Sequence, residues 1–268
     1  MKIGVLKETV SGESRVAATP ETVKKMIALS HSVSIEAGAG IQASISDEDY
    51  QNNGADIVSR DQALKSDLLL MVRPLSEKEI TTLKPTQFLV GMLEPFNNEL
   101  QNLLKKQGVS AFALEALPRN TRAQSMDVLS SQANIAGYKA VILAADYYKK
   151  FMPMLMTAAG TVKAAKVIVL GAGVAGLQAV ATAKRLGAVV EASDVRPSVQ
   201  EQIESLGGKF IEVPFETEEE KECAIGQGGY AKPMPKSWLT RQSKIVAEKA
   251  ISADIIITSA LIPGKSPP

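Results

Sequence analysis

The sequence predicts an α/β protein of two domains, each built around a parallel sheet, with a long helix joining them. Apolar strand-like runs alternate with polar segments of helical spacing through the first half of the chain. A long alanine-rich segment follows, and the alternation then restarts at Lys166. Such alternation is typical of parallel sheets that carry helices on both faces.

The first domain is predicted over residues 1–130. Its expected strands are residues 3–6, 33–36, 68–72, 88–92 and 109–114. Polar segments of helical spacing separate them, which predicts crossover helices between parallel strands. The charges of Lys2, Lys7 and Glu8 come too early for the apolar region of a signal peptide, so the start is interpreted as a strand.

Residues 131–160 are predicted to form a connecting helix and a linker. The segment 130–148 is rich in alanine and apolar on more than one face, which favours a long, largely covered helix. Pro153 and the glycine at 160 are expected to end it.

The second domain is predicted over residues 161–268. We expect strands at 167–170, 189–193, 209–213 and 255–258, with helices at 174–186, 198–206 and 238–251. The stretch 216–235, rich in glutamate and glycine, is either a functional lid or a solvated, partly disordered insertion. A full dinucleotide fold has about six strands, so we expect a fragment whose second domain is incomplete at its C-terminus.

Composition excludes several classes of protein. The 30 basic and 29 acidic residues nearly cancel, so no global charge favours nucleic acid or an anionic membrane. One cysteine and one histidine leave no zinc cluster, and we expect no bound metal and a reducing compartment. The longest uncharged run lies between Lys166 and Lys184 and is shorter than the ~20 residues that span a bilayer, so no transmembrane helix is expected.

A glycine motif opens the second domain. Gly171, Gly173 and Gly176 have GxGxxG spacing, follow an apolar strand and precede a helix. In this context the first glycine permits a tight turn, the second lets a pyrophosphate approach the backbone, and the third lets helix and strand pack closely. The N–H groups of Val174 and Ala175 then face the diphosphate at the helix N-terminus. The motif predicts a Rossmann-like domain that binds a dinucleotide.

The acidic residue Asp194 defines the expected cofactor. It ends the second strand, 18 residues after Gly176, where a carboxylate accepts both ribose hydroxyls of the adenosine. Because a carboxylate there repels a 2′-phosphate, we predict NAD(H) rather than NADP(H). Arg196 is interpreted as solvated or as facing the diphosphate, rather than as the partner of a 2′-phosphate.

Four segments carry a resemblance to a known family: residues 119–138 (RNTRAQSMDVLSSQANIAGY), 13–20 (ESRVAATP), 229–232 (GYAK) and 258–265 (TSALIPGK). Together with the glycine motif, they closely resemble the NAD(H)-binding component, domain I of the alpha subunit, of proton-translocating NAD(P) transhydrogenase. The likeness extends over essentially the whole chain.

The resemblance implies roles for particular side chains. Arg119, Gln124, Asp127 and Ser130 match the loop that holds the dihydronicotinamide in that family, and Gln124 and Asp127 are expected to position the reacting ring. Tyr230 matches the family's mobile loop and is expected near the nucleotide. Helix capping by Asp127 is the structural alternative, since the residue precedes a helical run.

The resemblance also implies partners and a location. The chain is expected to transfer hydride between NADH and NADP⁺ together with an NADP(H)-binding component and a membrane-spanning component that conducts protons. A homodimer is implied, placed peripherally on the cytoplasmic or mitochondrial matrix face of an inner membrane.

Two other functions remain open. Alanine dehydrogenase has a similar two-domain organisation and the same Arg-Val-Ala start, but deamination needs proton transfer, normally by lysine and histidine. At the matching places this chain has Val72-Arg73-Pro74 and Gly-Met-Leu-Glu at 91–94, and its histidine, His31, falls at a predicted helix end. Direct hydride transfer needs only two rings held about 3–3.5 Å apart. A non-catalytic NAD-sensing module is the third interpretation.

Overall fold

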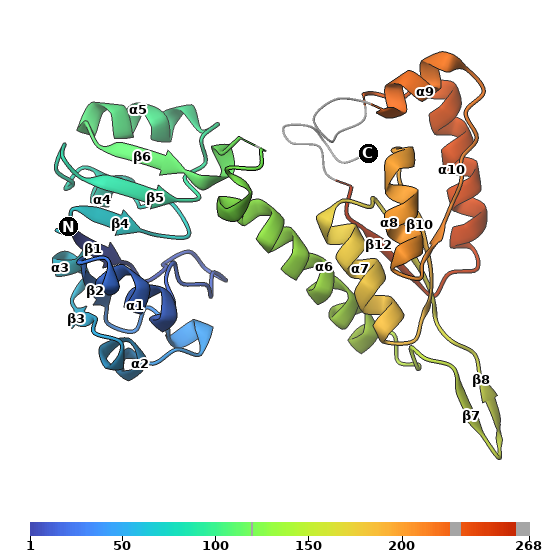
Figure 1. Cartoon of the computed structure of the whole chain (residues 1–268), viewed down its shortest axis with the longest axis horizontal. Coiled ribbons are helices and arrows are strands. Elements are labelled where there is room, and N and C mark those ends of the chain that lie inside the picture. Colours follow the sequence, from blue (N-terminus) through green and yellow to red (C-terminus); the bar gives the residue numbers. More distant parts are fainter. Residues whose placement is uncertain (119, 226–231, 261–268) are drawn as a thin grey trace. The chain divides into compact units, whose positions relative to one another are not determined.

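The computed structural model describes residues 1–118, 120–225 and 232–260 (Figure 1). The chain divides into two compact units, unit 1 (Met1–Val128) and unit 2 (Leu129–Pro268). Both are α/β units with parallel sheets, so the predicted fold class is confirmed.

Unit 1 is a doubly wound α/β unit. Its strands are β1 (Lys2–Val5), β2 (Ser32–Glu36), β3 (Asp56–Val58), β4 (Leu68–Leu70), β5 (Phe88–Gly91) and β6 (Ser110–Ala113). They form one parallel sheet in the order β3-β2-β1-β4-β5-β6. The order reverses between β1 and β4, and the carboxyl ends of these two strands mark the edge where such sheets bind ligands. Strand β3 was not predicted from the sequence, because it is only three residues long.

Helices cover both faces of this sheet. They are α1 (Pro20–Ala28), α2 (Asp47–Asn52), α3 (Arg60–Ala63), α4 (Glu77–Ile80) and α5 (Asn98–Gln107). Val23 of α1 and Tyr50 of α2 pack with Val5 in one cluster, whereas Ile80 of α4 packs with Leu69 in the other. The central strand β4 shows the alternation, since Leu69 lies in one core whereas Leu68 and Leu70 pack against the other.

The predicted long helix is α6 (Val128–Tyr147). It lies close to α7 at Gly137, where a Cβ would overlap the carbonyl oxygen of Ala175. Val141, one turn further along, is 1% exposed in the core of unit 2. The small residues of α6 therefore let its backbone lie directly against the next helix.

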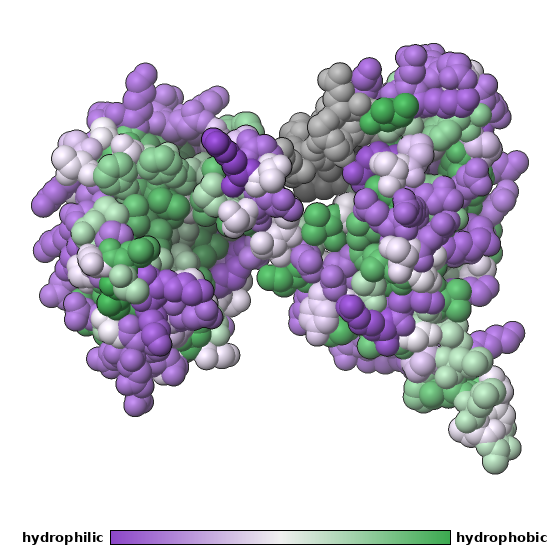
Figure 2. All heavy atoms as spheres, in the orientation of Figure 1, coloured by the Kyte–Doolittle hydropathy of each residue, from purple (hydrophilic) through white to green (hydrophobic). Residues whose placement is uncertain are grey.

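A hairpin replaces the linker expected after α6. Strands β7 (Leu155–Thr157) and β8 (Gly160–Val162) pair antiparallel, and hydrophobic residues gather over them (Figure 2). Pro153 and Gly160 indicated only the end of a helix. Strands of three residues carry too little alternation to be recognised in a sequence.

The main sheet of unit 2 is also parallel. Among the described residues it contains β9 (Lys166–Leu170), β10 (Val189–Ser193), β11 (Lys209–Phe210) and β12 (Ile255–Thr258), in the order β11-β10-β9-β12. The helices are α7 (Val174–Arg185), α8 (Gln200–Ser205), α9 (Glu218–Ile225) and α10 (Lys236–Ala250). The switch in strand order lies between β9 and β12, as it lies between β1 and β4 in unit 1.

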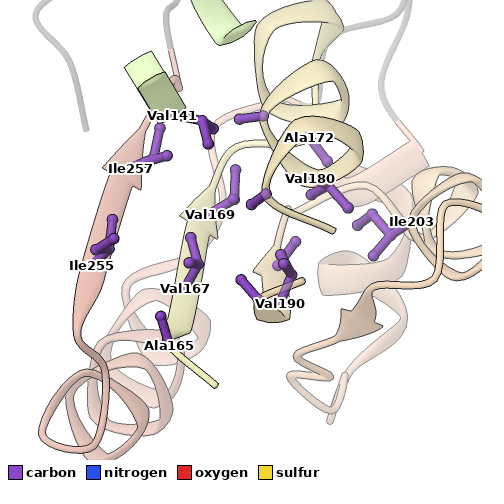
Figure 3. Close-up of a cluster of buried hydrophobic side chains, with 14 of the residues drawn as sticks. Val141, Ala165, Val167, Val169, Ala172, Val180, Val190, Ile203, Ile255 and Ile257 are labelled. Carbon is purple, nitrogen blue, oxygen red and sulfur yellow. The ribbon is translucent and has the colours of Figure 1, made fainter. Parts of the chain in front are cut away.

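One apolar core joins this sheet to α6, α7 and α8. Val167 and Val169 of β9 point the same way as Val190 of β10 and meet Val180 of α7 (Figure 3). Ile203 of α8 is fully buried in the same cluster. This packing fixes the carboxyl end of β9 relative to the start of α7.

The stretch at 216–235 contains a helix that sequence analysis did not predict. Glu220 of α9 is 1% exposed, and its carboxylate accepts hydrogen bonds from Ser237 Oγ at 3.0 Å and from Arg241 at 3.3 Å. Residues 218–225 therefore form a helix that Glu220 and Ala224 anchor, while most of its other side chains are exposed to solvent. Tyr230 lies outside the described residues.

Candidate functional site

The glycine turn of unit 2 links β9 to α7 and is built by close backbone approach. Gly171 has a φ of +94°, and a Cβ there would lie 2.7 Å from the backbone nitrogen of Ala260. A Cβ on Gly176 would overlap the carbonyl oxygen of Gly171. Glycine is therefore required at both positions by the fold itself.

Gly173 is the exception within this turn. A Cβ added to it would meet no atom of the described residues within 4 Å, and its φ of −75° is open to any residue. It is the N-cap of α7 and has no side chain to satisfy the first N–H groups of the helix. Val174 and Ala175 follow at the first two helical positions. Free space in front of a helix N-terminus is what a diphosphate requires.

Asp194 lies directly after β10 and is fixed to the turn. Its Oδ2 accepts a hydrogen bond from the backbone N of Ala172 at 2.7 Å, and its side chain is 7% exposed. Burial raises the pKa of Asp194, but hydrogen bonds from Arg196 and Ala172 outweigh burial, so the pKa lies below its usual value. The carboxylate is therefore ionised beside the turn.

Arg196 pairs with this carboxylate. Its Nε donates to Asp194 Oδ1 at 2.9 Å and its Nη2 donates to Oδ2 at 3.0 Å. The backbone N of Arg196 also donates to Oδ1 at 2.9 Å. With Ala172, four donors fill the acceptor positions of one carboxylate. Arg196 is therefore bound to Asp194 rather than simply solvated, which was one of the two interpretations of the sequence. Ribose hydroxyls can reach Asp194 only when the guanidinium moves.

Ser259 supports the glycine turn, a role that was not predicted from the sequence. The residue follows β12, its Oγ donates to the carbonyl oxygen of Gly171 at 2.8 Å, and its backbone N donates to Leu170 at 2.8 Å. Because β12 lies beside β9 at the switch point, its carboxyl end supports the turn. Predicting this role would have required knowing that β12 pairs with β9, and the sequence alone does not give that pairing.

The residues expected to hold the nicotinamide lie where α6 begins. Gln124 is exposed in a single 3₁₀ turn (Gln124–Met126), and Asp127 directly precedes α6, a position that also suits helix capping. Ser130 lies in unit 2, two turns before Gly137 on the same side of α6. That side meets Ala175 of the glycine turn. Arg119 lies outside the described residues.

A second polar cluster lies at the switch point of unit 1. Glu13, with a side chain 6% exposed, binds Arg15 Nη2 at 2.6 Å and Arg73 Nε at 3.1 Å. The hydrogen bonds from Arg15 lower the pKa of Glu13 to about 2. Glu8 accepts from the backbone N of Val72 at 2.6 Å, and burial raises its pKa.

His31 lies away from that cluster. It directly precedes β2, at the amino ends of the parallel strands, whereas the cluster follows the carboxyl ends of β1 and β4. The sheet therefore separates the imidazole from the edge at which ligands bind.

Two absences hold for the described part of the chain. No group of three or more His, Cys, Asp or Glu side chains in it could hold a metal ion. None of its helices is long and apolar enough to cross a membrane.

Comparison with known families matches both halves of the chain. The family described as alanine dehydrogenase/PNT, N-terminal domain, matches residues 4–136, and the corresponding C-terminal domain matches residues 140–268.

Individual relatives point to one branch of this family. The chain is 48% identical to the first of the polypeptides that make up NAD(P) transhydrogenase subunit alpha of Rhodospirillum rubrum, covering 100% of this chain and 71% of that relative. It is 43% identical to NAD(P) transhydrogenase subunit alpha of Haemophilus influenzae and spans 52% of that length. Alanine dehydrogenase 1 of Staphylococcus aureus is 29% identical, with 100% of this chain and 67% of that protein covered.

Solved structures give the same order of similarity. The crystal structure of transhydrogenase from Sinorhizobium meliloti is 45% identical, has a TM-score of 0.88, and is matched over 100% of this chain and 72% of that one. A structure of L-alanine dehydrogenase has a TM-score of 0.76 at 28% identity, with 100% and 68% covered. The chain belongs to the alanine dehydrogenase/PNT family, and within it is more similar to these transhydrogenase alpha subunits than to these alanine dehydrogenases.

Proposed function

We propose that this chain is the NAD(H)-binding part of a transhydrogenase that transfers hydride directly between NADH and NADP⁺. The observation that carries the proposal is the open Cβ position of Gly173 in a turn whose other two glycines are fixed by backbone contacts. The need for a tight turn alone accounts for Gly171 and Gly176. The fold does not require glycine at 173, but a diphosphate bound at the helix N-terminus would need the space that a side chain there would fill.

NAD(H) is the proposed cofactor, and membership of the family supports it. Asp194 supplies an ionised carboxylate beside the turn, where it favours a free ribose and repels a 2′-phosphate. Arg196 is proposed to leave Asp194 when the ribose hydroxyls arrive and to face the diphosphate. NADP(H) is proposed to bind a partner component.

Gln124 and Asp127 are proposed to orient the nicotinamide, together with Arg119 and Ser130. An amide and a carboxylate offer hydrogen bonds to a carboxamide and to ribose hydroxyls. The support from the structure is that Ser130 shares a side of α6 with Gly137, which contacts the glycine turn. Tyr230 is proposed to cover the nucleotide, on the resemblance of its segment alone.

Direct hydride transfer requires no general acid or base from the protein. The bound nicotinamide supplies a hydride, which carries two electrons and a proton nucleus together, so no side chain has to accept or donate a proton. The task of the residues is to hold the ring in a near-attack geometry. Among the described residues at the unit 1 switch point, Glu13 is ion-paired with both Arg15 and Arg73, and His31 lies at the opposite edge.

The partners are proposed from the relatives. Those with higher identity are named as alpha subunits, which supports assembly with other subunits. We propose a membrane-spanning component that conducts protons, an NADP(H)-binding component, and a homodimer of this chain. Proton translocation would be coupled through these partners, with this chain peripheral on the cytoplasmic or mitochondrial matrix face of the membrane.

The test is a pair of assays on one preparation. Hydride transfer from NADH to an NADP⁺ analogue is measured with a purified NADP(H)-binding component added, and reduction of NAD⁺ by alanine is measured without it. Transfer in the first assay and none in the second are expected. Alanine oxidation would instead identify an alanine dehydrogenase, and NADH binding without transfer would identify a sensor.

A further inference from the structure

Helix α6 lies against the first turn of α7, the turn that is proposed to face the diphosphate (Figure 1). The two helices touch through backbone atoms. A Cβ on Gly137 would overlap the carbonyl oxygen of Ala175 and would lie 2.9 Å from its carbonyl carbon. Gly137 is in the interior of a helix of 20 residues, where glycine is less favourable than alanine. The contact with α7, rather than the helix itself, therefore accounts for this glycine.

The glycine turn is the more firmly held partner in this contact. Asp194, after β10, accepts a hydrogen bond from the backbone N of Ala172 at 2.7 Å. Ser259, after β12, donates through its Oγ to the carbonyl oxygen of Gly171 at 2.8 Å. A Cβ on Gly176 would overlap that same oxygen, so α7 is also packed tightly on the turn. Because the turn is fixed from three sides, a side chain added between the helices should displace α6 instead.

Helix α6 is anchored in the core of unit 2 after this contact. Within α6, all of which the structure describes, the buried residues are Gly137 and Val141. Val141 is 1% exposed and packs in the same cluster as Ile257 (Figure 3). Toward the start of the helix, Ser130 and Ala133 lie on the same side but are only half-buried. The N-terminal half of α6 can therefore tilt about Val141.

The length of α6 enlarges a small displacement at the contact. Gly137 lies four residues from Val141, about 6 Å along the helix axis, whereas Ser130 lies eleven residues from it, about 16 Å. A Cβ at residue 137 clears the carbonyl oxygen of Ala175 only if the helices separate by about 1 Å. A tilt of that size about Val141 moves Ser130 by more than about 2 Å.

We propose that Gly137 is a positioning residue for hydride transfer, because the close contact of α6 with α7 sets the distance between the diphosphate turn and Ser130. This inference rests on the proposed function, in which Ser130 helps to hold the nicotinamide. A dinucleotide bound at the turn carries its nicotinamide away from the diphosphate, so a shift of Ser130 displaces the ring and leaves the diphosphate in place. A misplacement of about 1 Å can lower the rate about 100-fold.

The test compares Gly137→Ala with Ala136→Ser. Each substitution adds one heavy atom to α6, but Ala136 is exposed. Single-turnover transfer from NADH to an NADP⁺ analogue, with the NADP(H)-binding component added, gives the rate. Fluorescence titration gives the Kd for NADH, and urea unfolding gives the folded fraction. Gly137→Ala should keep the Kd within about threefold of wild type and lose about 100-fold in transfer rate per folded molecule. Ala136→Ser should match the wild-type chain in both.

A second substitution tests the rigidity of α6 without any steric overlap. Asn134 is exposed between Ser130 and Gly137, and glycine at this position loosens the part of the helix that carries Ser130. Asp146→Gly is the matched control, since Asp146 is exposed on the other side of Val141. Asn134→Gly should slow transfer at least about threefold with an unchanged Kd for NADH. Asp146→Gly should leave both quantities unchanged.

A folded Gly137→Ala protein that transfers hydride at the wild-type rate would overturn this inference and leave the proposed function standing. Loss of NADH binding in the folded variant would also overturn it, because the turn rather than α6 would then have moved. If Gly137→Ala does not fold, an unchanged transfer rate in Asn134→Gly would overturn the inference. A wild-type chain that binds NADH but transfers no hydride would instead overturn the proposed function on which the inference rests.

Discussion

The carboxylate of Asp194 accepts a 2.7 Å hydrogen bond from the backbone N of Ala172, which lies between Gly171 and Gly173 in the glycine turn. This bond ties the end of β10 to the turn that follows β9. The two features expected to select the cofactor, the diphosphate cradle and the ribose carboxylate, are therefore held in one rigid unit. A nucleotide that binds the turn must meet a negative charge at a fixed place.

Asp194→Asn should reduce the preference for NADH over NADPH. We expect the wild-type chain to favour NADH by at least about tenfold, equal to ~1.4 kcal/mol. The substitution removes the charge that repels a 2′-phosphate while keeping an oxygen acceptor for Ala172. Fluorescence titration with both nucleotides measures the ratio. Glu191→Gln, on the strand that precedes Asp194 and paired with Lys249, is the control. Equal wild-type affinities would refute the assignment.

Gly173→Val should abolish nucleotide binding without unfolding the protein. A Cβ at 173 meets no described atom within 4 Å, and valine is only somewhat less favourable than glycine at an N-cap, so the unfolding free energy should fall by no more than about 1 kcal/mol. The same side chain would fill the approach of the pyrophosphate. Isothermal titration with NADH and urea unfolding measure the two effects. Unaltered NADH affinity would mean that the turn has a structural role alone.

Gly176→Ala provides the contrasting outcome. Its Cβ would overlap the carbonyl oxygen of Gly171 and lie 2.9 Å from Ser259 Oγ. The turn must shift to admit it, so this smaller substitution should lower the unfolding free energy by about 1–3 kcal/mol. A stable Gly176→Ala protein would show that the turn tolerates displacement, and the packing argument would fail.

Gln124→Ala and Asp127→Asn should slow hydride transfer more than they weaken NADH binding. A ring displaced by about 1 Å can lose about 100-fold in rate, whereas most of the binding energy lies at the turn and the ribose. Single-turnover transfer with the NADP(H)-binding component, beside NADH titration, separates the effects. Helix capping by Asp127 predicts instead a loss of stability with an unchanged transfer rate per folded molecule.

Glu13 should stabilise the fold in a pH-dependent manner. Its pKa is lowered from 4.5 to about 2 in the folded state, so its contribution is complete above pH 4.5 and is lost as the pH falls toward 2. Glu13→Gln should cost about 2 kcal/mol at pH 7 and progressively less below pH 4.5. Urea unfolding from pH 7 to pH 3 measures the difference. Glu21→Gln, an exposed carboxylate on α1, should show little difference throughout. A constant cost for Glu13→Gln would contradict the ion-pair account.

The sequence predicted the local features of the site because those features are encoded within short segments. The run from β9 through the glycines into α7 combines an apolar strand, a spacing and a helix, all within 20 residues of Lys166. Asp194 was found because its distance from the glycines follows from one helix and one strand. The roles of Gln124, Asp127 and Tyr230 came from resemblance, and they stay predictions.

Tertiary contacts were beyond the sequence. Ser259 supports Gly171 only because β12 lies beside β9, a neighbour relation between segments far apart in the chain. The pairing of Arg196 with Asp194 depends on side-chain geometry after β10. Helix α9 was not predicted because its run of glutamates indicated a solvent-exposed segment. In the structure Glu220 is buried, and its carboxylate binds Ser237 and Arg241.

The most direct measurement follows a labelled hydrogen. NADH carrying deuterium at the transferable position of C4 is mixed with an NADP⁺ analogue, this chain and the NADP(H)-binding component in ordinary water. Direct transfer predicts that the deuterium appears in the reduced analogue without dilution by solvent hydrogen, and that Gly173→Val abolishes the transfer. Reduced analogue that carries solvent hydrogen, or no reduced analogue from a wild-type chain that binds NADH, would contradict the account.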